Sequence, residues 1–285
     1  MAVGANPDGS LGILPEEWLK KYALLFKVGD GRADNLRLSK YHLGVIDELY
    51  ENRNEAELTF ALDEKFEKLR AFKQIPSTIA PPNLEPILRP YQLAGFQWLN
   101  YLHDVGWGGI LADDMGLGKT VQALSMLQHF NTVNGNLLAI VICPTTLIYN
   151  WQNEVKKFTP DITCVIHHGN ARSRDMEFLK KHNIIITTYG TLRSDISLFL
   201  KFKFDYVVLD ESQAIKNPSS KVTKAASLLN ATNRLCMSGT PLQNNTFDIY
   251  AQMNFLNPGL LGSVEYFRNE FANPIDKFGE QEQKE

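Results

Sequence analysis

Six short apolar segments alternate with helical patterns from about residue 87 onward, and this alternation limits the possible folds more than any other feature of the sequence. The segments are continuously apolar, which is typical of strands that are covered on both faces. Strands that alternate with helices favour a parallel sheet with helices on both sides. We therefore predict an α/β fold with a mostly parallel sheet flanked by helices. The predicted strands are residues 108–112, 137–143, 163–168, 183–189, 206–211 and 233–239.

The first 80 residues have a different pattern, and we predict that they form a small, mainly helical accessory region. Apolar residues recur at helical spacing over 14–25 and again over 58–69. Three prolines in the stretch 81–86 then forbid a continuous helix. The predicted domains are the accessory region (1–80), the α/β domain (81–275) and a C-terminal tail (276–285).

Composition excludes several classes of function. The formal net charge is −3, whereas a chain that mainly grips nucleic acid is usually more basic, so any such contact must come from a local patch or from a part of the protein outside this chain. The three cysteines lie far apart in apolar runs without a C-x-x-C pair, which indicates reduced thiols and argues against a zinc site. The sequence has no signal peptide, and no apolar run approaches the roughly 18 residues of a membrane span. We expect no membrane contact.

The segment DDMGLGKT (113–120) ends like a phosphate-binding loop, G-x-G-K-T. The common pattern has glycine at its first position, where this chain has Asp113, whose side chain need not touch phosphate. Glycines let backbone N–H groups approach phosphate oxygens, and the following helix N-terminus favours negative charge. In that reading Lys119 reaches the β- and γ-phosphates of ATP and Thr120 binds Mg²⁺; an incidental glycine-rich turn is the alternative. The candidate nucleotide-binding residues of this segment are Asp114, Met115, Gly116, Leu117, Gly118, Lys119 and Thr120.

Two adjacent carboxylates, Asp210 and Glu211, end a predicted buried strand about ninety residues after Lys119. At the carboxyl end of a parallel strand, both would point into the crevice where ligands bind. We expect Asp210 to hold Mg²⁺ through water and Glu211 to polarise the attacking water. Taken alone, such a pair reads as a solvated turn; beside a phosphate loop, it reads as part of a catalytic site that comprises Lys119, Asp210 and Glu211.

Six motifs in order over residues 87–275 resemble the first motor lobe of the Snf2 family of superfamily 2 helicase-like ATPases. They are LRPYQLAGFQWL, DDMGLGKT, CPTTLIYNW, TTYGTL, DESQAIKN and MSGTPLQN. The resemblance implies a RecA-like lobe, with ATP and Mg²⁺ as cofactors and duplex DNA as the partner. It also implies a motor that moves along DNA, in a bacterial-type, cytoplasmic, nucleoid-associated protein. We expect a monomer.

The resemblance also implies roles for particular residues. Gln92 is similar to a glutamine that reads the adenine edge, framed by Arg89 and Tyr91. Gln213, Ser238, Gly239 and Thr240 match positions that couple the nucleotide state to motion between lobes. The segments that would face the DNA backbone contribute Pro144, Thr145, Thr146, His168, Gly169, Thr188 and Tyr189, whose contacts would carry no sequence information.

Simpler interpretations of several of these residues stay open. Tyr91 could be a core residue, and His168 could be no more than a strand-end residue. Thr145 or Thr146 could be a helix cap.

The sequence departs from the family pattern in two respects. The family box D-E-A-H reads DESQ here, and Gln213 offers hydrogen bonds but carries no charge, so coupling is open to change. The second lobe's Q-x-x-G-R-x-x-R type pattern is absent, and we expect a fragment that binds nucleotide weakly and hydrolyses it little. A strand-separating helicase and a nucleotide-gated scaffold without productive hydrolysis are the alternatives.

Overall fold

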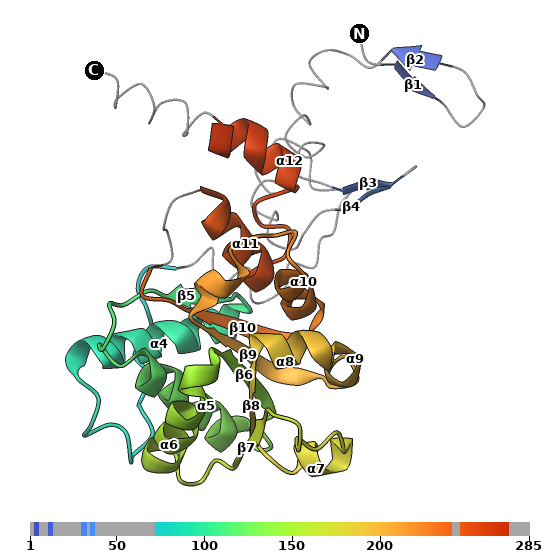
Figure 1. Ribbon diagram of the computed structural model, residues 1–285. Helices are drawn as coiled ribbons and strands as arrows, with labels where there is room; N and C mark the ends of the chain where they lie inside the picture. The colour runs from blue at the N-terminus through green and yellow to red at the C-terminus, as the bar shows by residue number, and fades with distance from the viewer. Residues whose placement is uncertain are drawn as a thin grey trace, which may run out of the picture. The chain divides into compact units, whose positions relative to one another are not determined.

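The computed structural model describes residues 72–240 and 246–273, together with four three-residue strands nearer the N-terminus (Figure 1). The chain divides into two compact units, and the α/β fold occupies the unit Asp63–Leu256. The predicted helices over 14–25 and 58–69 and the predicted tail lie outside the described residues. The predicted domain boundaries therefore stay predictions.

The other unit combines Met1–Leu62 with Asn257–Glu285. Its described strands form two antiparallel pairs, β1 (Val3–Ala5) with β2 (Leu11–Ile13) and β3 (Asp30–Arg32) with β4 (Asn35–Arg37). Its described C-terminal part consists of α12 (Val264–Phe267) and a π-helical turn, η4 (Arg268–Ala272).

The α/β unit is built on a six-stranded sheet in the order β5-β10-β9-β6-β8-β7. Every neighbouring pair is parallel, which confirms the predicted sheet. The strands are β5 (Gly109–Leu111), β6 (Ala139–Cys143), β7 (Cys164–His167), β8 (Ile184–Thr188), β9 (Phe204–Asp210) and β10 (Ala231–Met237). Because all six run the same way, their carboxyl ends share one edge of the sheet.

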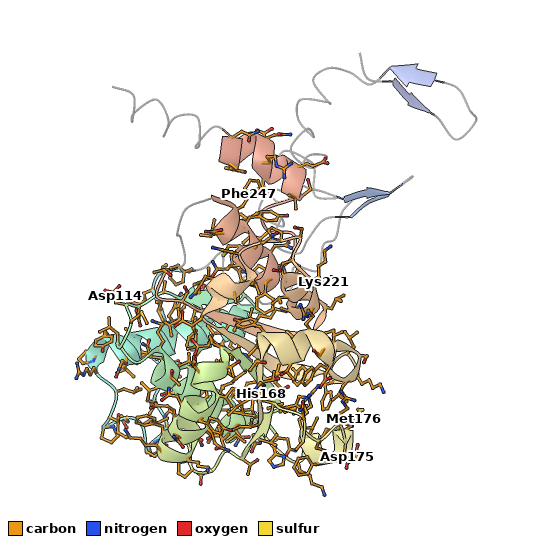
Figure 2. All side chains as sticks on the ribbon, viewed as in Figure 1. Asp114, His168, Asp175, Met176, Lys221 and Phe247 are labelled. Atoms are coloured by element: carbon orange, nitrogen blue, oxygen red, sulfur yellow. The ribbon has the colours of Figure 1, made fainter. Side chains whose placement is uncertain are left out.

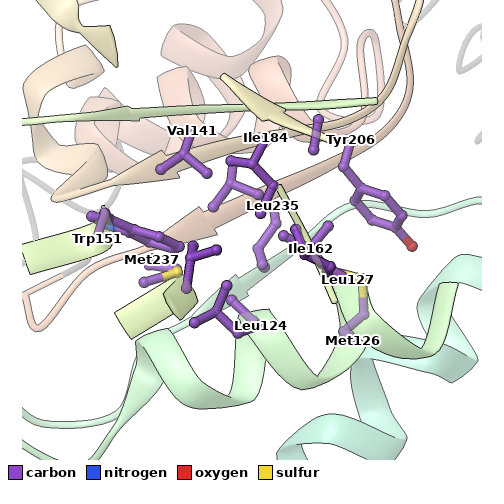
Figure 3. Close-up of a cluster of buried hydrophobic side chains, with 14 of the residues drawn as sticks. Leu124, Met126, Leu127, Val141, Trp151, Ile162, Ile184, Tyr206, Leu235 and Met237 are labelled. Atoms are coloured by element: carbon purple, nitrogen blue, oxygen red, sulfur yellow. The ribbon is translucent and has the colours of Figure 1, made fainter. Parts of the chain in front are cut away.

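Alternate residues of each strand pack into two separate cores, which explains why the strands are continuously apolar. In β6, Val141 belongs to one core, while Ile140 and Ile142 belong to the other. The first core includes Leu124, Trp151 and Met237 (Figure 3) and is covered by α4 (Pro90–Val105), α5 (Lys119–Asn134) and α6 (Ile148–Phe158). The second core is covered by α8 (Tyr189–Ser194), α9 (Ile196–Phe199), α10 (Lys221–Leu228) and α11 (Thr246–Leu256).

Local sequence sets the ends of the helices near the strand ends. Proline at the first position of α4 has its φ preset and has no N–H to leave unbonded, and Gly106 ends that helix in the left-handed region with φ 70°. Gly118, with φ 80°, turns the chain directly into α5. In α6, Ile148, Trp151 and Val155 form the buried face. A 3₁₀ turn, η2 (Thr145–Leu147), precedes α6, and α7 (Met176–Lys180) precedes β8.

No helix in the described ranges has the length and apolar character needed to cross a membrane.

Candidate nucleotide site and strand-end surface

The predicted phosphate loop follows β5 and leads into α5, so the strand–loop–helix context is the one its sequence predicts. Gly116 and Gly118 both have positive φ, 84° and 80°, which an L side chain rarely adopts. The Lys119 ammonium donates to the carbonyl oxygens of Asp113 at 2.6 Å and Asp114 at 3.0 Å. An ammonium has three donors, so one remains for a phosphate oxygen while these two bonds are kept.

Asp113 occupies the loop's first position, and its side chain turns away to the next helix. Its carboxylate accepts a hydrogen bond from the Gln122 amide at 2.7 Å. Gln122 is fully buried and lies against α4, where a β-carbon at Gly95 would come within 1.9 Å of the Gln122 amide oxygen. Aspartate can therefore replace the usual glycine at this position, because its side chain bonds to α5 and connects the start of the loop to that helix.

Gln92 and Tyr91, the predicted adenine-side residues, brace the phosphate loop. The Gln92 amide donates to the Leu117 carbonyl at 3.0 Å and accepts from the Arg89 N–H at 2.9 Å. The Tyr91 hydroxyl donates to the same Leu117 carbonyl at 3.1 Å. Each end of the Gln92 amide makes one hydrogen bond within the chain. A side-chain amide has a second N–H and a second lone pair, so reading an adenine edge would not require either bond to open. The adenine-reading role stays a prediction.

Asp210 is 7% exposed at the end of β9 and is held by three hydrogen bonds. Its carboxylate accepts from the Trp151 indole N–H at 2.8 Å and from the Glu211 N–H at 2.9 Å. The Tyr189 hydroxyl donates to its main-chain oxygen at 2.7 Å. Burial raises the pKa of the Asp210 carboxyl, and the hydrogen bonds from Trp151 and the Glu211 N–H offset this only in part.

Glu211 adopts a left-handed backbone conformation, φ 49° and ψ 54°, which is unusual for a residue with a β-carbon. Its carboxylate accepts from the Gln213 amide at 2.7 Å. The other end of that amide accepts from the Ser238 hydroxyl at 2.9 Å, and Ser238 in turn accepts from the Thr240 N–H at 3.0 Å. A continuous hydrogen-bonded path therefore joins the acidic pair to the segment after β10.

Gly239, in the same segment, lies against the phosphate loop. A β-carbon there would come 2.9 Å from Cγ of Met115 and 3.9 Å from the Lys119 ammonium nitrogen. The structure thus brings the predicted coupling residues Ser238, Gly239 and Thr240 next to both parts of the nucleotide site.

The donor set fits Mg²⁺ bound together with a nucleotide. The Thr120 hydroxyl and the Asp210 carboxylate offer hard oxygen atoms, the carboxylate through an intervening water, and Mg²⁺ usually keeps several waters and takes only one or two carboxylates plus substrate phosphates. No group of three or more His, Cys, Asp or Glu side chains within the described residues could hold a metal on its own. Phosphate oxygens would therefore have to complete the coordination.

The predicted DNA-facing residues end or follow β6, β7 and β8, on the same edge as the nucleotide site. Asp114 and His168, which follow the two outermost strands, are labelled in Figure 2. Thr145 and Thr146 are exposed in η2, which begins after Pro144. Neither threonine provides a side-chain cap, since η2 and α6 both begin without one. Their exposed hydroxyls are available for contact with a ligand.

Thr188 and Tyr189 are engaged inside the protein. Thr188 is 4% exposed, caps α8 by accepting from the Thr191 N–H at 3.1 Å, and donates to the Thr191 hydroxyl at 2.9 Å. The Thr191 hydroxyl lies 3.2 Å from Nδ1 of His168. Gly169 has φ 79°. Thr188 and Tyr189 therefore stabilise the fold through hydrogen bonds within the chain, and their contact with DNA stays a prediction.

An ionic cluster that the sequence did not reveal supports the loop after β7. Asp195 is 4% exposed and accepts from Arg172 at 2.5 and 3.0 Å and from Arg174 at 3.3 Å. Nε2 of buried His167 lies 2.9 Å from the same carboxylate. Arg172 also donates to the Gly169 carbonyl at 2.6 Å. The cluster thereby fixes the backbone beside His168.

Fold and site together define a class: a parallel α/β sheet whose strand ends carry a phosphate loop, an acidic pair and a serine–glycine–threonine segment is a RecA-like P-loop ATPase lobe. Residues 91–285 match the SNF2-related domain family. The chain belongs to that family, and the predicted resemblance to Snf2-type ATPases is confirmed.

Similar proteins include several named ATP-dependent helicases. An uncharacterized ATP-dependent helicase of Mycoplasma genitalium is 36% identical over 244 residues, which is 84% of this chain and 23% of that protein. The putative ATP-dependent helicase/translocase YwqA of Bacillus subtilis is 32% identical over 225 residues, 78% of this chain and 24% of that protein. The chain thus spans about a quarter of the length of these relatives.

Solved structures give the same result. The SWI2/SNF2 ATPase core of Sulfolobus solfataricus in complex with dsDNA is 41% identical with a TM-score of 0.63, covering 67% of this chain and 40% of that one. A second structure, the SWI2/SNF2 ATPase core domain of Sulfolobus solfataricus, is 37% identical with a TM-score of 0.60, covering 72% of this chain and 41% of that one.

Proposed function

We propose that this chain is the first, ATP-binding lobe of a motor that uses ATP hydrolysis to move along duplex DNA. The observation that carries the proposal is the path Glu211–Gln213–Ser238, which links the water-polarising carboxylate to the segment beside the phosphate loop. A site that only binds nucleotide does not need this link. The similarity to an ATPase core in complex with dsDNA supports duplex DNA as the partner.

Each site residue has a specific task in this proposal. Lys119 and the loop N–H groups bind the phosphates, and Glu211 orients and polarises the attacking water. Thr120 and Asp210 would hold Mg²⁺, which neutralises charge on the β- and γ-phosphates when bound. Pro144, Thr145, Thr146, His168 and Gly169 would contact the DNA backbone.

A second lobe would complete the ATP site. Residues that stabilise charge on the transferring phosphoryl group, such as an arginine finger, accelerate related reactions about 10³–10⁵-fold. The chain has no Q-x-x-G-R-x-x-R type pattern to supply them. We therefore propose that this lobe alone is nearly inactive and works as part of a monomeric, cytoplasmic, nucleoid-associated protein with both lobes.

The test is ATP turnover by a longer protein that contains this chain and a second lobe, measured with duplex DNA, single-stranded DNA and RNA. Strong stimulation by duplex DNA that Lys119→Ala abolishes is the expected result. Displacement of a third strand from a duplex, without unwinding of that duplex, would separate translocation from strand separation. Bound ATP without stimulation by any nucleic acid would instead favour a scaffold, and Glu211→Gln would then change no measured property.

A further inference from the structure

Two side chains from different segments donate hydrogen bonds to Asp210, the predicted Mg²⁺ residue. The Trp151 indole N–H reaches its carboxylate at 2.8 Å, and the Tyr189 hydroxyl reaches its main-chain oxygen at 2.7 Å. Trp151 lies in α6, after β6, and Tyr189 begins α8, after β8. Asp210 is thus held from outside its own strand on both its side chain and its backbone.

Each donor is connected to residues that lie at the strand ends. Trp151 lies near the start of α6, the helix that follows exposed Thr145 and Thr146. Tyr189 directly follows Thr188, whose hydroxyl bonds Thr191. Thr191 in turn lies 3.2 Å from the ring of His168. A ligand bound to these residues would therefore be connected to Asp210 through a short series of covalent and hydrogen bonds.

The packing makes these links stiff. Trp151 has no exposed surface and is surrounded by the first core, so its ring can move only with α6. A buried indole N–H that lost its partner would carry the full cost of its removal from water. The separation of Trp151 from Asp210 is therefore unfavourable, and displacement of α6 favours displacement of the carboxylate.

We propose that Trp151 and Tyr189 are positioning residues that hold Asp210 and transmit movement of segments 144–146 and 168–169 to it. The transmission rests on the proposed function, because it requires nucleic acid at those segments. The positioning does not, because it concerns the nucleotide site alone.

Two conservative variants test the positioning. Trp151→Phe removes the N–H donor and keeps an aromatic ring, and Tyr189→Phe removes one oxygen. Matched controls are Trp98→Phe, which lies in α4, and Tyr206→Phe, whose hydroxyl bonds His103. The measurement is binding of a fluorescent ATP analogue to this chain during an MgCl₂ titration, with a thermal melt of each variant.

The Mg²⁺ midpoint is the MgCl₂ concentration that gives half of the full Mg²⁺-dependent binding of the analogue. We expect it to rise about 10-fold in both test variants, because loss of a partner that orients a metal-binding residue typically lowers metal affinity 10–100-fold. Binding without Mg²⁺ and both controls should not change. A purely structural role would lower the melting temperature without moving the midpoint. Unchanged midpoints in both variants would overturn the positioning role, and Tyr189→Phe keeps the test valid if Trp151→Phe folds poorly.

The transmission is tested in the longer protein by the ratio of ATP turnover with and without duplex DNA. We expect this ratio to fall about 2- to 30-fold in each variant, the usual range for residues that couple two sites. An unchanged ratio in both variants would overturn the transmission alone. A wild-type protein that no nucleic acid stimulates would contradict the proposed function and the transmission together, while the Mg²⁺ midpoints would still decide the positioning.

Discussion

The Ser238 hydroxyl donates to the amide oxygen of Gln213 at 2.9 Å and so joins the segment after β10 to the acidic pair after β9. The opposite end of the same amide donates to Glu211. Gln213 therefore needs one donor and one acceptor, which a neutral imidazole also provides. This is the physical reason why glutamine can stand where the family usually has histidine.

Gln213→Glu should lower DNA-stimulated turnover of the longer protein about 100-fold, the typical scale for loss of a positioned general base. The new carboxylate would lack the donor and would repel Glu211. Gln213→His is the matched control and should stay within about 10-fold of wild type. Steady-state turnover and nucleotide binding are the measurements. Equal turnover in the two variants would contradict a role for this bond.

Replacement of Glu211 by glycine should make the fold more stable and the enzyme inactive. A left-handed residue with a β-carbon stores about 1–3 kcal/mol of strain. Glu211→Gly should therefore raise the free energy of unfolding by about 1 kcal/mol and abolish turnover, whereas Glu211→Gln should abolish turnover alone. Urea denaturation measures the difference. Asn136→Gly, at an exposed residue with φ 49°, should stabilise less and leave turnover intact.

Asp195 should contribute to stability over most of the pH range. The hydrogen bond from Arg172 holds the pKa of this carboxyl well below its usual range. The ionised form therefore stabilises the fold at pH values above about 4, the usual pKa of aspartate, and this contribution is lost as the pH falls below it. Asp195→Asn should cost about 3 kcal/mol at pH 7, because it leaves Arg172 without its counter-charge. The difference between wild type and variant should narrow in acid denaturation below pH 4.

His167 should make the wild-type fold less stable as the pH falls through about 6.5, the usual pKa of histidine. Burial lowers the pKa of His167 despite its contact with Asp195. The unfolded chain therefore takes up the proton first, and stability rises with pH across this window. Urea midpoints at pH 5 and pH 7.5 should differ more in wild type than in His167→Asn. A steeper dependence in the variant would contradict the assigned direction.

Gly95→Ala should loosen the entrance of the phosphate loop. The added methyl group would meet the Gln122 amide oxygen at 1.9 Å and displace the amide that holds Asp113. We expect a loss of about 1–2 kcal/mol in stability and weaker nucleotide binding. Ala94→Gly, which alters the neighbouring residue of the same helix, is the control for helix propensity. Unchanged binding of the ATP analogue by Gly95→Ala would show that Gln122 can relocate without effect on the loop.

The strands were predictable because their apolar runs are short and bounded, yet two of them begin earlier than predicted. β9 starts at Phe204 and includes Asp205, a charged residue that directly precedes the apolar run from Tyr206 to Leu209. The Asp205 carboxylate accepts from the Leu138 N–H at 2.8 Å, and the Asp205 N–H donates to the Leu138 carbonyl. A polar residue is thus stable in the strand because its partner lies 67 positions away, which no local pattern contains.

The phosphate loop and acidic pair were also predictable, since each is a contiguous motif. Trp151 was not: an indole at helical spacing reads as a core residue, and the buried ring is indeed one. Its proposed role as a positioning residue depends on the direction of one indole N–H, which donates to Asp210 at the end of β9. Likewise, nothing near Asp195 in the sequence indicates that Arg172 and His167 meet there.

The order β5-β10-β9-β6-β8-β7 divides the sheet into two halves. The ends of β5, β10 and β9 carry the ATP residues, and those of β6, β8 and β7 carry the residues expected to face DNA. Along the chain, however, the second half is one unbroken stretch from Ala139 to Phe199. The two junctions of this stretch with the rest of the chain precede β6 and β9, so both lie on the edge of the sheet away from the nucleotide site. A change at the strand ends of the second half would therefore leave the ATP residues in place, provided that Trp151 and Tyr189 keep their hydrogen bonds to Asp210.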